Sequence, residues 1–291
     1  MENAAHAESL DHEVYRTPLA VQPEFEFRKT PENYRRSYFE AAKLPDQIKV
    51  WRVQTTQQGN VVAPGYGFED SPDAEIIAVG FNHGKACGDV GIGRQANFLQ
   101  WGYSDPPSQM TEAGRRLFIN CVHYIRRFDG KTPLVRRQIS GRLNALLSVS
   151  ILKLITEKKS FFTSTFPAEL WDKYQSDLDG LLALYRKNLE LVYWEKVYRI
   201  DNDLKSLGIE SNRKVETLER LIALLGDESR APTARTLLYR YTRVSLDTPT
   251  KWRQWFEANR DRIFFTDVGG YKFLVVPEGY PVARRAQTPS P

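Results

Sequence analysis

Cysteine and histidine are scarce in this chain, and their spacing excludes several kinds of site. The 291 residues include two cysteines and four histidines. Two thiols are too few for a disulfide-rich scaffold or a four-thiolate zinc site, and we expect Cys87 and Cys121 to be unpaired. No H-x-x-x-H or C-x-x-C spacing is present, so we expect neither a bound metal nor another cofactor. The run 201–203 (DND) lacks the glycine and glutamate of a calcium loop and is expected to be a helix N-cap cluster.

Long apolar runs are also missing, and the net charge is small. No stretch approaches the ~18 apolar residues of a membrane-spanning helix, so we do not expect an integral membrane protein. The 41 basic and 36 acidic residues give a formal net charge of +5, which is weak for a nucleic-acid-binding protein. Both signs are mixed along the same predicted helices, as on a solvated or partner-facing surface. Nucleic acid is therefore not an expected partner.

The N-terminal residues leave the compartment open. The first 17 residues lack the basic start and the apolar stretch of a signal peptide. Ala5-His6-Ala7 has the small-x-small form of a cleavage site, so two alternatives stay open: a cytoplasmic protein, or an exported one whose signal peptide has been removed. Residues 1–29 are expected to form an extended arm, and residues 281–291 a disordered tail.

Apolar and aromatic residues, at 41% and 12% of the chain, are abundant enough for a core. We expect residues 30–139 to form a partial α/β layer domain. Its expected elements are a helix at 30–43, strands at 48–53, 75–80 and 97–103, a glycine-rich connection at 84–93, and a helix at 111–128. Apolar spacing predicts one buried stripe on the last helix, made of Leu117, Phe118, Cys121, Val122 and Ile125.

The pattern changes after residue 140. Residues 140–260 are expected to form a helical region of antiparallel hairpins. Its helices are predicted at 142–153, 168–196, 213–225, 232–241 and 248–259. At 261–280, two apolar runs flank Asp267-Val268-Gly269-Gly270 and predict a β-hairpin. We expect it to pack on the helix that carries Trp252, or to extend the sheet at 75–80. The predicted fold class is α+β.

One segment carries a family resemblance. Residues 73–130 hold Gly91-Ile92-Gly93-Arg94 and then a helix of the form T-x-x-G-R-x-L-F-x-N-x-x-x-Y-I, beginning at Thr111. This segment resembles the closing part of class I glutamine-amidotransferase-like domains of the trehalose-utilisation type. The catalytic members' G-x-C/S-x-G elbow has no counterpart here, so the resemblance implies a remnant, or a domain that a partner completes. Residues 211–213, 237–242 and 259–274 resemble parts of uncharacterised, often exported proteins of planctomycete-like bacteria.

Two candidate sites lie in the glycine-rich connection. Cys87 has His83 and a lysine nearby, which could lower the pKa of its thiol and make it a nucleophile. We favour the alternative of a loop thiol without special reactivity. The second candidate is an anion-binding loop made of Lys85, Gly91, Gly93 and Arg94. Its alternative is a tight turn that needs a positive φ at a glycine.

These observations favour a non-catalytic interaction or structural subunit of a larger assembly. No catalytic constellation is recognisable, and the abundant arginine and aromatic residues are typical of protein interfaces. A protein partner or a homo-oligomer is therefore expected. Two alternatives stay open: an enzyme or carbohydrate-active accessory of the amidotransferase-like class, and an anion- or nucleic-acid-binding module.

Overall fold

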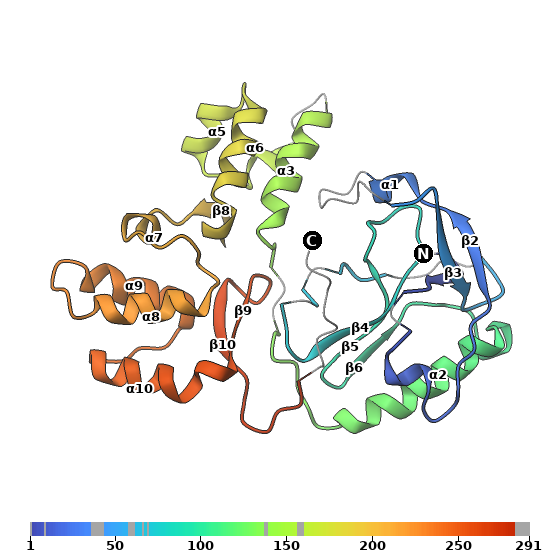
Figure 1. Cartoon of the computed structure of the whole chain (residues 1–291). Helices are drawn as coiled ribbons and strands as arrows, with labels where there is room; N and C mark the ends of the chain where they lie inside the picture. Colours follow the sequence, from blue (N-terminus) through green and yellow to red (C-terminus); the bar gives the residue numbers. More distant parts are fainter. Residues whose placement is uncertain are drawn as a thin grey trace. The chain divides into compact units, whose positions relative to one another are not determined.

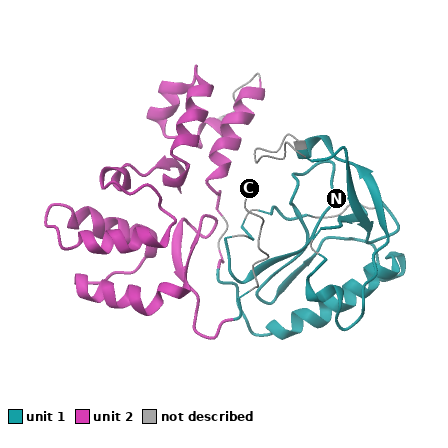
Figure 2. Ribbon diagram, in the orientation of Figure 1, with its two compact units in different colours: residues 1–134, 281–291 teal, residues 135–280 magenta. Residues whose placement is uncertain are grey.

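Two units make up the α+β fold that the sequence predicts, as Figure 1 and Figure 2 show. Unit 1 consists of Met1–Leu134 together with Pro281–Pro291, and unit 2 of Val135–Tyr280. This computed structural model describes residues 2–8, 10–35, 44–57, 62–65, 67–68, 70–136, 139–155 and 160–282. Each unit encloses hydrophobic cores of its own. The expected tail lies outside the described residues from residue 283 onward.

The described residues of unit 1 form two three-stranded antiparallel sheets, with the orders β1-β3-β2 and β4-β5-β6. The strands are β1 (Ala4–His6), β2 (Phe25–Lys29), β3 (Gln47–Arg52), β4 (Ala74–Val79), β5 (Val90–Gln95) and β6 (Phe98–Trp101). An antiparallel bridge between Ala5 and Gly80 joins the two sheets. The expected arm at 1–29 supplies β1, β2 and the short 3-10 helix η1 (Glu13–Tyr15). Of the helix expected at 30–43, the described part is α1 (Glu32–Arg35).

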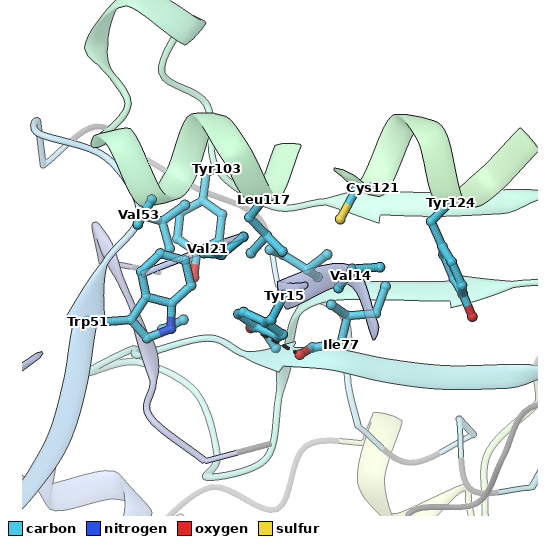
Figure 3. Close-up of a cluster of buried hydrophobic side chains, with 14 of the residues drawn as sticks. Val14, Tyr15, Val21, Trp51, Val53, Ile77, Tyr103, Leu117, Cys121 and Tyr124 are labelled. Atoms are coloured by element: carbon cyan, nitrogen blue, oxygen red, sulfur yellow. Dashed lines mark hydrogen bonds between the residues drawn. The ribbon is translucent and has the colours of Figure 1, made fainter. Parts of the chain in front are cut away.

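Helix α2 (Glu112–Ile125) closes the core of unit 1. Thr111 is its N-cap, and the Thr111 hydroxyl accepts a hydrogen bond from the Gly114 N–H at 3.0 Å. Leu117 and Cys121 are fully buried, and Figure 3 shows them pointing at Val14 and Ile77.

The expected stripe on α2 is confirmed in part. Phe118 and Ile125 are half-buried, but Val122 is 50% exposed, so its predicted burial is wrong. Successive helical residues lie about 100° apart, and the buried face continues through Asn120 and Tyr124 instead. Val122 is therefore turned away from the sheet.

The connection expected at 84–93 is shorter than predicted. Val90 already begins β5, so Gly91 and Gly93 are strand residues. Gly93 is needed for space, because a Cβ there would lie 2.7 Å from Cε1 of Phe68. The positive φ that the sequence suggested for this region occurs at Gly88, at +94°. The three predicted strands, observed as β3, β4 and β6, are confirmed to within a few residues.

The part of unit 2 that the structure describes is mainly helical and encloses two cores. Its helices are α3 (Leu143–Leu154), α4 (Ser160–Thr163), α5 (Ala168–Tyr174), α6 (Leu178–Lys187), α7 (Asn202–Ser206), α8 (Val215–Leu224), α9 (Ala231–Thr242) and α10 (Pro249–Asn259). One core lies among α3, α6 and the strands that follow α6. The other lies among α7 to α10 and the C-terminal hairpin. Figure 1 shows α8, α9 and α10 beside that hairpin.

The prediction of a single helix at 168–196 is wrong. The chain breaks at Asp177, whose carboxylate accepts a hydrogen bond from the Gly180 N–H at 2.8 Å and caps α6. A β-hairpin then follows, formed by β7 (Val192–Glu195) and β8 (Val197–Ile200) around Lys196 with φ +62°. These strands are rich in β-branched and aromatic residues, which favour extended structure over helix.

The C-terminal hairpin is confirmed as β9 (Ile263–Thr266) paired with β10 (Lys272–Val275). Phe273 is buried in one core with Trp252 and Phe256, but the strands themselves pack mainly on α8 and α9. The hairpin thus shares a core with the helix that carries Trp252 and does not extend the sheet at 75–80. Gly270 adopts φ +111° in its turn. Arg142, 2% exposed, forms an ion pair with Asp267 in the same turn and ties it to the segment before α3.

Candidate functional site

Cys87 packs against a small core of unit 1, and His83, the candidate base, pairs with Glu2. The residue is half-buried and packs against the cluster that contains Tyr34 and Phe81. Burial raises the pKa of the Cys87 thiol, and nearby carboxylates raise it further. His83 is engaged elsewhere, because its Nε2 lies 2.5 Å from Oε1 of Glu2. These contacts favour the loop-thiol alternative, since a nucleophilic cysteine needs a lowered pKa.

The residues of the predicted anion loop have separate surroundings. Arg94 is 1% exposed, and its Nε donates to Oε1 of Glu75 at 2.5 Å. The Arg94 guanidinium also lies 3.7 Å from the centre of the Phe128 ring. Lys85 is exposed on the preceding loop, whereas Gly93 is buried within β5. The contacts of Arg94 thus lie in the interior of unit 1, away from the exposed Lys85 side chain.

Glu75 is the centre of a buried polar cluster that sequence reasoning missed. Besides Arg94, it accepts a hydrogen bond from the Tyr124 hydroxyl at 2.5 Å and lies 3.3 Å from Nε2 of His12. Burial alone would raise the pKa of Glu75. Hydrogen bonds from His12, Arg94 and Tyr124 outweigh that effect and lower the pKa to about 2. The cluster holds η1, β4, β5 and α2 together, and no single stretch of sequence signals it.

A polar cleft of about 390 Å³ lies in unit 2, and its main charges are paired with one another. The buried Asp201 carboxylate accepts hydrogen bonds from Nη1 of Arg240 at 2.7 Å and from the Tyr241 hydroxyl at 2.5 Å. Arg240 also donates to Asp203 at 3.0 Å, and Lys205 donates to Asn188 at 3.2 Å. Asp201 caps α7, which confirms the expected N-cap cluster. The cleft residues thus join α7 to α9.

The outer edge of β2 presents backbone groups to the surroundings. β3 flanks β2 on one side, and no other described strand flanks β2 on its opposite side. The Thr30 N–H donates to the Asp46 carbonyl at 2.9 Å, so even-numbered residues direct their N–H and C=O groups toward β3. Phe25, Phe27 and Lys29 therefore direct theirs outward. We call the segment Phe25–Lys29 with these outward groups the β2 edge.

Two aromatic side chains of the β2 edge are unusually exposed. Phe25 is 43% exposed and Phe27 is 66% exposed, on the same face of the sheet. Nζ of Lys49 lies 4.1 Å from the centre of the Phe25 ring. On the opposite face, Glu26 and Arg28 are half-buried and joined by an ion pair. The alternation in FEFRK is visible in the sequence, but its position at a sheet edge is not.

Comparisons with known proteins add no functional assignment. The chain matches no protein-family model, and no curated protein or solved structure shows significant similarity to it. In the described part of the chain, no helix has both the length and the apolar character needed to cross a membrane. Within the same residues, no group of three or more His, Cys, Asp or Glu side chains is placed to hold a metal ion. The β2 edge therefore stands as the candidate site on its own geometry.

Proposed function

We propose that the chain is a non-catalytic interaction subunit and that the β2 edge is the surface through which it joins a larger assembly. The observation that carries the proposal is the combination of an edge strand with two exposed phenylalanines, Phe25 and Phe27. An edge strand with outward N–H and C=O groups is a template for adding a further strand. Partner binding here would satisfy those groups and cover both rings at once.

The energetics favour occupation of this surface. Burying a phenylalanine side chain is worth about 1.5–3 kcal/mol, so two partly exposed rings can contribute substantially to association. Many edge strands are protected by a β-bulge or by a covering segment. The β2 strand pairs with β3 without a register shift, no other described strand covers its outer side, and its aromatic rings lie on the more exposed face. Such an arrangement suits a binding surface.

The other sites of the chain support this proposal over an enzymatic one. Cys87 has a raised thiol pKa and His83 is occupied by Glu2. The charges of the cleft around Asp201 are paired internally. Under this proposal, the segment that resembles amidotransferase-like domains serves as the scaffold that presents the β2 edge.

Site-specific photocrosslinking tests the proposed function. A photoreactive phenylalanine analogue is placed at Phe27, in cells that produce the protein. The matched control carries the analogue at Phe98, which is 65% exposed on β6 of the same unit. We expect a discrete protein adduct from position 27 and little from position 98. No adduct from position 27, or equal adducts from both positions, would overturn the assignment of the β2 edge as the interaction surface.

A further inference from the structure

We infer that the occupant of the β2 edge is the β2 edge of a second copy of this chain, paired antiparallel about a two-fold axis at Phe27. The inference rests on the proposed function and adds the identity of the partner. It follows from which backbone groups point outward and from the order of charges in Phe25–Lys29. The sheet β1-β3-β2 of one copy and the same sheet of the second copy would then form one continuous six-stranded sheet.

The backbone allows this register. Only the odd-numbered residues Phe25, Phe27 and Lys29 offer outward N–H and C=O groups. With the axis at Phe27, Phe27 faces its own copy and Phe25 faces Lys29 of the second copy. Each of these facing pairs can exchange two N–H···O bonds, the pattern of hydrogen-bonded pairs in an antiparallel ladder. All the outward groups of the β2 edge are then satisfied.

The side chains of the β2 edge are self-complementary in the same register. Glu26 faces Arg28 of the second copy, and the symmetry repeats this pair, so opposite charges meet twice. Phe27 lies against its symmetry mate, and the Lys29 ammonium faces a Phe25 ring, a contact that Lys49 already makes within one chain. An isologous interface requires this kind of self-complementarity.

Neighbouring registers are disfavoured by charge or by proline. An axis at Glu26 would set two carboxylates against each other, and an axis at Arg28 would set two guanidinium groups against each other. An axis at Phe25 would bring Pro23 into a hydrogen-bonding position, and an axis at Lys29 would do the same with Pro31. Proline has no N–H to donate. Pairing centred on Phe27 avoids both problems.

Charge reversal tests the partner. Purified Glu26→Arg and Arg28→Glu chains are studied separately and as a mixture by sedimentation, from about 1 µM to about 300 µM, a range suited to a small interface. We expect wild type to dimerise and each single variant to raise the dissociation constant about tenfold or more, because like charges then face each other twice. The mixture should recover dimers, since each variant supplies the charge that the other lacks. Circular dichroism and melting temperature verify that both variants fold.

Cysteine crosslinking tests the register. In a Cys87→Ser background, Phe27→Cys should form a disulfide-linked dimer, because hydrogen-bonded facing residues have Cα atoms about 5.5 Å apart. Phe25→Cys is the matched control and should not link, because the two Phe25 positions lie about four residues apart along the strands, roughly 13 Å. Efficient linkage of Phe25→Cys without linkage of Phe27→Cys would overturn the inference. So would sedimentation that finds the wild type monomeric and finds no dimer in the mixture of Glu26→Arg and Arg28→Glu chains. A photocrosslink from position 27 to a different protein would overturn it and leave the proposed function standing.

Discussion

Replacing Asp267 by asparagine should destabilise unit 2 by about 3–5 kcal/mol, the usual effect of leaving a buried charge unpaired. The Asp267 carboxylate accepts bonds from Nη2 of Arg142 at 2.6 Å and from Nε at 2.8 Å. Arg142 is 2% exposed, so water cannot replace the lost charge. The other acceptors of the guanidinium, the Leu189 carbonyl and the Asn212 side chain, are neutral.

The assay is denaturant-dependent hydrogen exchange of peptides from unit 2, which reports the stability of that unit by itself. Glu219→Gln is the control, since Glu219 and Arg260 form an exposed pair 3.4 Å apart that is expected to contribute about 0–1 kcal/mol. Adding Arg142→Met to Asp267→Asn should restore part of the loss by removing the unpaired charge. The reasoning would be refuted if Asp267→Asn lowered the stability of unit 2 no more than Glu219→Gln does. It would also be refuted if the double variant were less stable than Asp267→Asn.

The pKa of Glu75 is about 2 in the folded protein and 4.5 in the unfolded chain. Its contribution to the stability of unit 1, about 3 kcal/mol, is therefore present above pH 4.5 and lost as the pH falls toward 2. In the Glu75→Gln variant, the stability of unit 1 should depend less on pH in that window. Gly114→Ala should cost more than about 2 kcal/mol in urea unfolding, because its Cβ would lie 2.0 Å from the Val53 carbonyl oxygen, whereas Gly226→Ala, with 3.7 Å to the nearest atom, should be tolerated. A thiol-labelling titration of the folded protein should modify Cys87 slowly and Cys121 only after unfolding, and equal fast rates would contradict the burial of Cys121.

Local signals in the sequence were sufficient for several elements. Thr111 followed by Glu112 marks the start of α2, and Asp267-Val268-Gly269-Gly270 marks the hairpin turn. The change from helix to β-hairpin within the helix expected at 168–196 was not visible locally, because residues 184–196 fit helical spacing as well as strand alternation. Tertiary contacts decide that segment: the Tyr185 hydroxyl donates to the Tyr198 carbonyl at 2.7 Å, and both rings are buried in one core.

The candidate site depended on long-range pairing. Phe25 and Phe27 alternate with charged residues, which suggests a strand, but no local feature shows which neighbours that strand has. Its place at an edge follows from β3 pairing with β1 on one side and β2 on the other. Composition was therefore enough to predict an interaction protein. Locating its proposed interaction surface needed the strand order β1-β3-β2.

Residue-resolved amide exchange at β2 tests the central claim most directly. In dilute protein, the inward amides of Glu26 and Arg28 should be protected by β3, and the outward amides of Phe27 and Lys29 should exchange freely. In concentrated or natively assembled protein, we predict that Phe27 and Lys29 slow by about tenfold or more while Glu26 and Arg28 change little. Outward amides that exchange at the same unprotected rate in both states would show that no strand is added at the β2 edge, and would contradict the account.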